Sequence, residues 1–312
     1  MSDVAAIDSL VKKFEDLKAE IGNVIIGQEQ AVNYVLLAIF CGGHSLLIGV
    51  PGLAKTLLVH TVSDALGLNF KRIQFTPDLM PSDILGSEIL NKEREFTFLK
   101  GPIFSNIILA DEINRTPPKT QAALLEAMQE KSVTIAGHHY KLDLPFLVLA
   151  TQNPIEQEGT YPLPEAQLDR FMFSINLEYP SFKEEVEVVK NTTTDIISKA
   201  SSLLSANEII EIQHLIRRVP VATNVIEYAV SLVAKTRPNS DQATESVNRY
   251  VDWGAGPRAS QNLILGAKAM AAVRGKYSPD IEDVQAVAIP ILSHRIVKNY
   301  KAEAENISVA EI

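Results

Sequence analysis

A glycine-containing loop between an apolar run and a helical pattern carries the clearest chemistry in this sequence. Leu46-Leu47-Ile48 has the composition of a buried strand, and Leu57 to Leu66 repeats apolar residues at helical spacing. Between them the chain reads Gly49-Val50-Pro51-Gly52-Leu53-Ala54-Lys55-Thr56. A strand, a glycine-rich turn, Lys-Thr and a helix form the context of a phosphate-binding loop. We therefore predict that residues Gly49 to Leu57 bind a nucleotide.

Each residue type in this loop has a physical role toward a polyphosphate. Gly49 and Gly52 let the backbone approach the ligand, and the start of the helix adds N–H groups and the positive end of its dipole. Lys55 is expected on the β- and γ-phosphates, and the Thr56 hydroxyl on Mg²⁺. Ala54 replaces the usual second glycine, which would cost about 1 kcal/mol if φ is positive there and almost nothing if it is negative. The alternative is an ordinary Gly-Pro turn.

Acidic and amide side chains follow the ends of two later apolar runs. Ile107 to Ala110 leads directly into Asp111-Glu112, and Phe146 to Thr151 leads into Asn153. A carboxylate that holds Mg²⁺ through water is a requirement of phosphoryl transfer, and Asp111 fits this role. Glu112 fits as the general base that polarises an attacking water, and Asn153 could orient the same water. Solvated acids at a strand end, and a turn asparagine before proline, are the alternatives.

A short turn upstream of the loop is a further candidate. Ile26-Gly27 separates two helical patterns, residues 4–21 and Glu29 to about Cys41. In nucleotide-binding proteins an apolar turn of this kind often packs on adenine. A plain helix–helix turn explains Ile26 and Gly27 equally well.

The order of apolar runs and helical patterns predicts an α/β fold with two domains. Strands alternate with helices as far as residue 177, which indicates a parallel sheet with helices on both faces. Ligands of such sheets bind at the carboxyl ends of the strands, so the loop, Asp111-Glu112 and Asn153 can share one rim. We expect a nucleotide-binding domain over residues 1–180, with an insertion near 84–103 and a hairpin near 132–142. A linker over 181–195 then leads to an all-α lid over 196–312.

Composition limits the location and the partners. The 312 residues include 46% hydrophobic and 21% charged residues, close to an ordinary globular chain. No run approaches the ~20 apolar residues of a membrane span, and the start lacks a signal peptide, so we expect a cytoplasmic protein. One cysteine, Cys41, excludes an internal disulfide. A net charge of −9 argues against a broad nucleic-acid surface.

Four segments together resemble the MoxR family of AAA+ ATPases. They are the loop at Gly49–Thr56, Leu109-Ala110-Asp111-Glu112-Ile113-Asn114-Arg115, Ala150-Thr151-Gln152-Asn153-Pro154, and Tyr161-Pro162-Leu163-Pro164-Glu165-Ala166-Gln167-Leu168-Asp169-Arg170-Phe171. The similarity spans most of residues 24–180 and resumes from Trp253 to Ala259. The family tolerates alanine at position 54, whereas Gly256 replaces an expected serine.

The resemblance implies further roles and partners. Asn153 would be the sensor-1 residue, Arg170 an arginine finger that reaches the nucleotide of a neighbouring subunit, and Arg258 the sensor-2 arginine of the lid. Arg115 has a weaker claim to an interface role. Family members usually form hexameric rings, hydrolyse ATP with Mg²⁺ and act as chaperone-like ATPases. Many work with von Willebrand factor A domain proteins in enzyme maturation or metal insertion.

The arginines also have ordinary explanations. Arg170 could be a core-edge arginine paired to Glu165 or Asp169, and Arg258 a surface arginine at a helix start. An arginine supplied across an interface can speed hydrolysis by ~10³–10⁵, which would couple turnover to assembly.

We expect a Mg²⁺-dependent ATPase that remodels a protein client, with a nucleic-acid motor and a non-catalytic nucleotide switch as alternatives. The feature that favours the nucleic-acid motor is the predicted hairpin tip His138-His139-Tyr140-Lys141. An intact Glu112 argues against the switch.

Overall fold

The computed structural model describes residues 3–90, 94–156, 159–194 and 199–312. Its helices are α1 (Asp3–Gly22), α2 (Glu29–Cys41), α3 (Lys55–Ala65), α4 (Pro81–Leu85), η1 (Ile113–Arg115), α5 (Pro118–Glu130), α6 (Glu165–Leu168), α7 (Phe182–Thr192), α8 (Ala206–Arg218), α9 (Thr223–Lys235), α10 (Glu245–Tyr250), α11 (Pro257–Val273), α12 (Ile281–Leu292) and α13 (Tyr300–Ala304). Its strands are β1 (Ser45–Ile48), β2 (Phe70–Gln74), β3 (Gly86–Leu90), β4 (Phe96–Lys100), β5 (Ile107–Asp111), β6 (Ser132–Ile135), β7 (His138–Lys141), β8 (Leu147–Gln152), β9 (Phe173–Asn176), β10 (Val251–Trp253) and β11 (Val297–Lys298).

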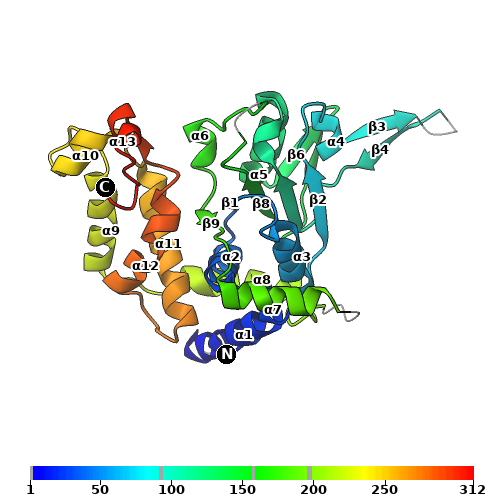
Figure 1. Cartoon of the computed structure of the whole chain (residues 1–312). Helices are drawn as coiled ribbons and strands as arrows, with labels where there is room; N and C mark the ends of the chain where they lie inside the picture. The colour runs from blue at the N-terminus through cyan, green and yellow to red at the C-terminus, as the bar shows by residue number, and fades with distance from the viewer. Residues whose placement is uncertain (1–2, 91–93, 157–158, 195–198) are drawn as a thin grey trace. The chain divides into compact units, whose positions relative to one another are not determined.

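A five-stranded sheet in the order β2-β5-β8-β1-β9 forms the centre of the nucleotide-binding part (Figure 1). Strand β5 pairs in parallel with β2 and β8, and β8 pairs in parallel with β1. Every residue of β5 and the first five of β8 are buried, which requires cover on both faces of the sheet. The predicted parallel sheet with helices around it and a C-terminal helical lid is confirmed.

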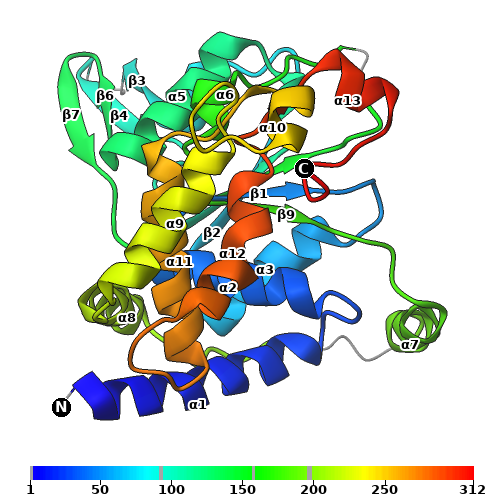
Figure 2. The ribbon, with the colours of Figure 1, turned by 90° about the vertical axis from the view of Figure 1, so that its left-hand side faces the viewer.

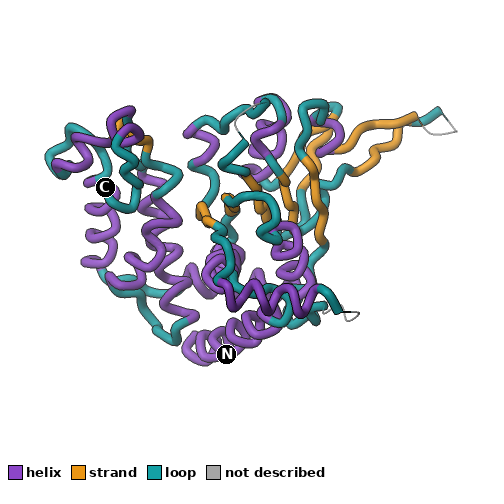
Figure 3. Tube along the Cα trace, in the orientation of Figure 1, coloured by secondary structure: helices purple, strands orange, loops and turns teal. Residues whose placement is uncertain are grey.

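Two hairpins interrupt this α/β pattern at the predicted places. Strands β3 and β4 pair antiparallel and extend away from the sheet, as the orange strands of Figure 3 show. Strands β6 and β7 form the second hairpin, with Ala136 and Gly137 at positive φ in its turn. Phe98 of the first hairpin stacks on Tyr140 of the second, with ring centroids 4.4 Å apart. The two hairpins are therefore fixed to each other by aromatic packing.

The chain divides into two compact units. One contains residues 15–164 and 175–210 and holds most of the sheet. The other contains residues 1–14, 165–174 and 211–312. In this second unit α9, α11 and α12 pack together (Figures 1 and 2), and β10 pairs antiparallel with β11. The unit thus includes a short segment, 165–174, that the predicted boundaries place with the α/β domain; those boundaries remain a prediction.

No helix among the described residues is both long enough and apolar enough to span a bilayer.

His44, which precedes β1, gives the fold a predictable acid sensitivity. Its Nδ1 accepts the N–H of Val148 at 3.0 Å, so Nε2 carries the proton that is donated to the Met128 carbonyl at 3.1 Å. Burial lowers the pKa of His44 to about 4. Between about pH 6.5 and pH 4 the unfolded chain therefore binds a proton at His44 that the folded chain does not. The free energy of unfolding falls as the pH is lowered through this range. We expect His44 alone to remove about 2 kcal/mol of unfolding free energy between pH 7.5 and pH 5.

Urea unfolding at the two pH values checks this expectation. His44→Gln should lose about 2 kcal/mol less than the wild type over the same interval. His214→Gln, at an exposed position, is the control for loss of an imidazole. An unchanged pH dependence in His44→Gln would show that the buried imidazole is not responsible.

Candidate functional site

The predicted phosphate-binding loop lies between β1 and α3, as the sequence pattern indicates. The N–H of Gly49 donates to the Gln152 carbonyl at 3.2 Å, which joins the loop to the end of β8. A Cβ built on Gly49 would come within 3.0 Å of the Leu177 Cβ and 3.2 Å of the Leu53 Cδ1. Only glycine fits there without displacement. Helix α3 begins at Lys55 with no side-chain cap, so the N–H groups of its first turn face the loop without a side-chain acceptor.

Ala54 adopts the left-handed conformation, with φ 54° and ψ 26°. This decides the question that the sequence left open, and alanine is the strained choice at this position. We expect Ala54→Gly to raise the unfolding free energy by about 0.5–1 kcal/mol, because relief of strain exceeds the added entropy of glycine when unfolded. Gly52→Ala should lower the unfolding free energy, because Gly52 has φ +89°. Nothing lies within 4 Å of a Cβ at this position, so the cost comes from the backbone conformation and not from a clash. Urea unfolding measures both; a less stable Ala54→Gly variant would contradict the interpretation.

The ammonium group of Lys55 turns back over the loop. Its Nζ donates to the carbonyl of Gly49 and, at 3.3 Å, to that of Val50. Burial lowers the pKa of Lys55, while the negative charges of Asp111, Glu112 and Glu156 raise it again. The loop lysine and the acidic pair at the end of β5 therefore lie within electrostatic range of each other, as a shared phosphate and metal site requires.

Thr151 on β8 holds the acidic pair in place. Its hydroxyl donates to Asp111 Oδ1 at 2.6 Å and accepts the backbone N–H of Glu112 at 2.8 Å. Asp111 is buried, and its other oxygen, Oδ2, accepts from Arg72 Nε at 2.9 Å and Nη2 at 2.7 Å. A buried carboxylate with these partners has its hydrogen-bonding needs met and is fixed in orientation.

Glu112 occupies a less regular position at the same strand end. Its backbone is left-handed, with φ 56° and ψ 50°, which turns the chain sharply after β5. Its Oε2 accepts from the Gln74 amide at 2.8 Å and lies 3.2 Å from Arg115 Nε. The carboxylate is thus oriented by neighbours on β2 and η1, a feature that suits a base acting at a fixed point.

Asn153 follows β8, the strand between β5 and β1, and so lies between the acidic pair and the phosphate loop. The side chain is buried, and its Oδ1 accepts the N–H of Ile155 at 3.2 Å. Arg115 lowers the pKa of the neighbouring Glu156, and a hydrogen bond from Asn153 lowers it further. Asn153 is therefore held on the rim by its own turn and by Glu156.

The donors present fit a magnesium ion. Thr56 supplies a hydroxyl in the first turn of α3, and Asp111 supplies a carboxylate whose oxygens can accept from a metal-bound water besides their present donors. Mg²⁺ usually takes one or two protein ligands and completes its shell with water and phosphate oxygens. Among the described residues no group of three or more His, Cys, Asp or Glu is placed to hold a metal ion.

The Ile26-Gly27 turn packs on the segment that follows β9. Gly27 has φ +74°, and a Cβ there would meet Pro180 and Glu184 at 3.1–3.2 Å. Gln28 Nε2 donates to the Glu178 carbonyl at 2.9 Å. Since Gly49 packs on Leu177, the turn and the phosphate loop contact one continuous segment, residues 177–184. A role for Ile26 and Gly27 toward adenine remains a prediction.

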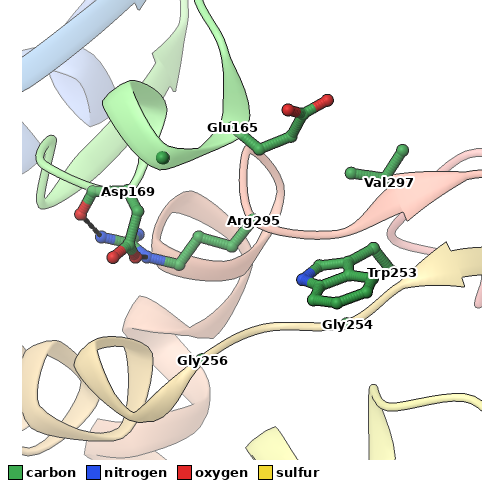
Figure 4. Close-up of a pocket in the computed structure, with 8 residues that line it drawn as sticks. Glu165, Asp169, Trp253, Gly254, Gly256, Arg295 and Val297 are labelled. Atoms are coloured by element: carbon green, nitrogen blue, oxygen red, sulfur yellow. Dashed lines mark hydrogen bonds and ion pairs between the residues drawn. The ribbon is translucent and has the colours of Figure 1, made fainter.

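The two predicted arginines belong to the second unit. Arg170 follows α6 and is half-buried, and Arg258 is exposed in the first turn of α11. Arg258 Nη1 donates to Asp169 Oδ2 at 2.9 Å. Figure 4 shows the same Asp169 reached by Arg295, whose Nε donates to Oδ1 at 2.8 Å. Asp169 and Arg295 border a cavity of about 520 Å³ that Trp253 also lines. Burial lowers the pKa of Arg295, and Asp169 opposes that shift.

Four residues that contact the predicted loop, acidic pair or Asn153 were not identified from the sequence. They are Arg72, Gln74, Thr151 and Glu156. In the second unit, Arg295, which contacts Asp169, was also not identified. Thr151 lies in the segment Ala150–Pro154 that resembles the MoxR family, immediately before Gln152-Asn153 at the strand end. Its position in the sequence could therefore have indicated a role at the site. The others lie on elements whose pairing with β5, η1 or α6 no local pattern reveals.

A parallel sheet with a phosphate-binding loop, a strand-end acidic pair and a helical lid defines an ATPase of the AAA+ class. A family model described as "ATPase family associated with various cellular activities (AAA)" matches residues 44–173, and an AAA lid domain model matches residues 243–312. Chaperone MoxR1 of Mycobacterium tuberculosis is 45% identical over 290 residues, 93% of this chain and 77% of that protein.

Two further proteins are similar over nearly the whole chain. The uncharacterized protein YeaC of Bacillus subtilis is 43% identical over 94% of this chain and 89% of its own length. The crystal structure of a presumed ATPase from Cytophaga hutchinsonii superposes with a TM-score of 0.91 at 47% identity, over 98% of this chain and 93% of that one. The chain therefore belongs to the MoxR family of AAA+ ATPases. The chain is an ATP-hydrolysing enzyme, so the alternative of a non-catalytic switch is wrong.

Proposed function

We propose that this protein hydrolyses Mg²⁺-bound ATP at the loop of residues Gly49–Leu57 and uses the cycle to remodel a protein client. The observation that carries the proposal is that Lys55 lies close enough to Asp111 and Glu112 for their negative charges to raise its pKa. The strand order explains this proximity, because β1 and β5 both border β8 in the sheet.

The side chains divide the work between binding and proton transfer. The backbone N–H groups of the loop and the Lys55 ammonium bind the β- and γ-phosphates. Glu112, oriented by Gln74 and Arg115, accepts the proton of the attacking water, and Asn153 orients that water. Thr56 and Asp111 would hold Mg²⁺, which neutralises phosphate charge when bound.

Arg170 and Arg258 complete the proposed machinery. Arg170 acts on the nucleotide of a neighbouring copy, so the chain works as a ring-forming homo-oligomer, with a hexamer as the expected state. Arg258 senses the nucleotide from the lid. A cytoplasmic location and a von Willebrand factor A domain partner, with enzyme maturation or metal insertion as the outcome, agree with the family and complete the proposal.

Phosphate release by the purified chain tests the enzymatic part. ATP with Mg²⁺ should give steady turnover, and EDTA should abolish it. Protein clients and partners can then be captured on the Glu112→Gln variant held with ATP. Turnover that rises with single- or double-stranded DNA and not with any captured protein would instead favour the nucleic-acid motor. The feature that favours this alternative is the hairpin segment His138-His139-Tyr140-Lys141, in which both histidines are exposed.

A further inference from the structure

A buried arginine makes several hydrogen bonds to the segment that carries Arg170, and the neighbouring His294 Nε2 lies 3.0 Å from the Phe171 carbonyl. Arg295 is 6% exposed and follows α12. Its Nη2 donates to the carbonyls of Asp169 at 3.1 Å and Phe171 at 2.6 Å, and its Nη1 lies 3.3 Å from the carbonyl of Met172. Its Nε also donates to the Asp169 carboxylate at 2.8 Å. One guanidinium therefore bonds the residue before Arg170 and the two residues after it.

This contact set uses a property that only arginine has. The guanidinium is planar, always charged and presents five N–H donors in a rigid fork. A lysine carries the same charge but has three donors on one nitrogen, which cannot reach the three carbonyls and the carboxylate together. The segment's own elements are short, since α6 has four residues. Arg295 thus supplies the backbone restraint that a longer helix would otherwise provide.

The same carboxylate joins the second predicted arginine to this arrangement. Asp169 Oδ2 accepts from Arg258 Nη1 at 2.9 Å, while Oδ1 accepts from Arg295 (Figure 4). Arg258 lies in the first turn of α11, Arg295 follows α12, and these two helices pack on each other. Residues 165–174 belong to the same compact unit as residues 211–312. The Arg170 segment and the lid helices are therefore parts of one compact unit.

We propose that Arg295 is a positioning residue that fixes Arg170 to the lid, with Asp169 linking it to Arg258. The proposal rests on the proposed function, in which Arg170 acts on the nucleotide of the neighbouring subunit. A movement of the lid helices is then transmitted to Arg170 through Arg295. The lid that responds to one subunit's nucleotide thereby controls the arginine offered to the next subunit.

Arg295→Lys tests the proposal, because it keeps the charge and removes the fork. We expect turnover to fall roughly 100-fold, the size of effect produced by misplacing a catalytic group by about 1 Å, with nucleotide affinity within about twofold of the wild type. The double variant Arg170→Ala/Arg295→Lys should be no slower than Arg170→Ala, since both changes remove one function.

Mixing subunits separates positioning from a general structural role. Glu112→Gln subunits cannot hydrolyse ATP but still offer Arg170, whereas Arg295→Lys subunits keep an intact site of their own. An equimolar mixture of the two should therefore recover about one quarter of wild-type turnover per chain. Half the chains keep Glu112, and half of these have a neighbour that offers a correctly placed Arg170. A mixture of Glu112→Gln with Arg170→Ala should recover the same fraction. No recovery with Arg295→Lys, when the Arg170→Ala mixture recovers, would overturn the positioning role. No recovery with Arg170→Ala would overturn the proposed function itself.

Two controls keep the result interpretable. Arg274→Lys disturbs another arginine of the same unit, which pairs with the buried Asp283 at 2.9 Å. Because it leaves the contacts of the Arg170 segment intact, it should keep turnover close to that of the wild type. The single tryptophan, Trp253, lines the cavity beside Arg295 and reports folding of this unit by fluorescence. If Arg295→Lys does not fold, Asp169→Asn keeps the carbonyl contacts and removes the ion pairs. It should lose about tenfold in turnover and recover in the mixture, and wild-type turnover in it would contradict the link.

Discussion

Glu112→Gln is expected to retain ATP binding and to lose hydrolysis by roughly 10²–10⁴-fold, the range that a general base contributes. Glutamine has the same shape and can keep the contact with Gln74, which lies 2.8 Å from Oε2 in the native protein. It cannot accept a proton from water. Phosphate release and binding of a fluorescent nucleotide, measured on the same preparation, give the two quantities.

A second carboxylate on the same rim provides the matched comparison. Glu156 also contributes to the electrostatic environment of Lys55 and pairs with Arg115. Glu156→Gln removes the same charge without removing the proposed base, so we expect a loss of less than about tenfold. Equal losses in the two variants would mean that charge near Lys55, and not proton transfer at Glu112, limits the rate. Full activity in Glu112→Gln would remove Glu112 from the mechanism.

Arg170→Ala is expected to lower turnover by about 10³-fold or more and to leave nucleotide affinity nearly unchanged, because an arginine finger stabilises charge that develops only in the transition state. If the arginine acts across an interface, wild-type turnover per chain should fall on dilution as the oligomer dissociates. Turnover per chain of Arg170→Ala should change little on dilution, because its neighbouring subunits offer no arginine to the nucleotide even when assembled.

Dilution series with sedimentation at the same concentrations measure this. Lys190→Ala, on the exposed helix α7, serves as a control for loss of a cationic side chain. Concentration-independent turnover in the wild type, at concentrations where the oligomer dissociates, would contradict the interfacial role of Arg170.

Much of the fold could be predicted because it depends on local patterns. Helix α2 runs over Glu29–Cys41, as its apolar spacing indicated, and the strands before Gly49, Asp111 and Asn153 end within two residues of the expected positions. Parallel strands place their carboxyl ends on one edge, so the order of elements was enough to bring these side chains to a common rim. The resemblance to the MoxR family added the roles that spacing alone does not give.

The sequence by itself therefore determined the phosphate loop, the acidic pair and the α/β class, because φ/ψ preferences and the hydrophobic period act over a few neighbouring residues. The tertiary structure alone decided the left-handed φ of Ala54, the Thr151 bridge between Asp111 and Glu112, and the Arg72 ion pair with Asp111. It also decided the contacts of Arg295 with a segment 126 residues earlier. Such contacts depend on which elements pack together, and side-chain partners at that separation leave no periodic trace in a single sequence.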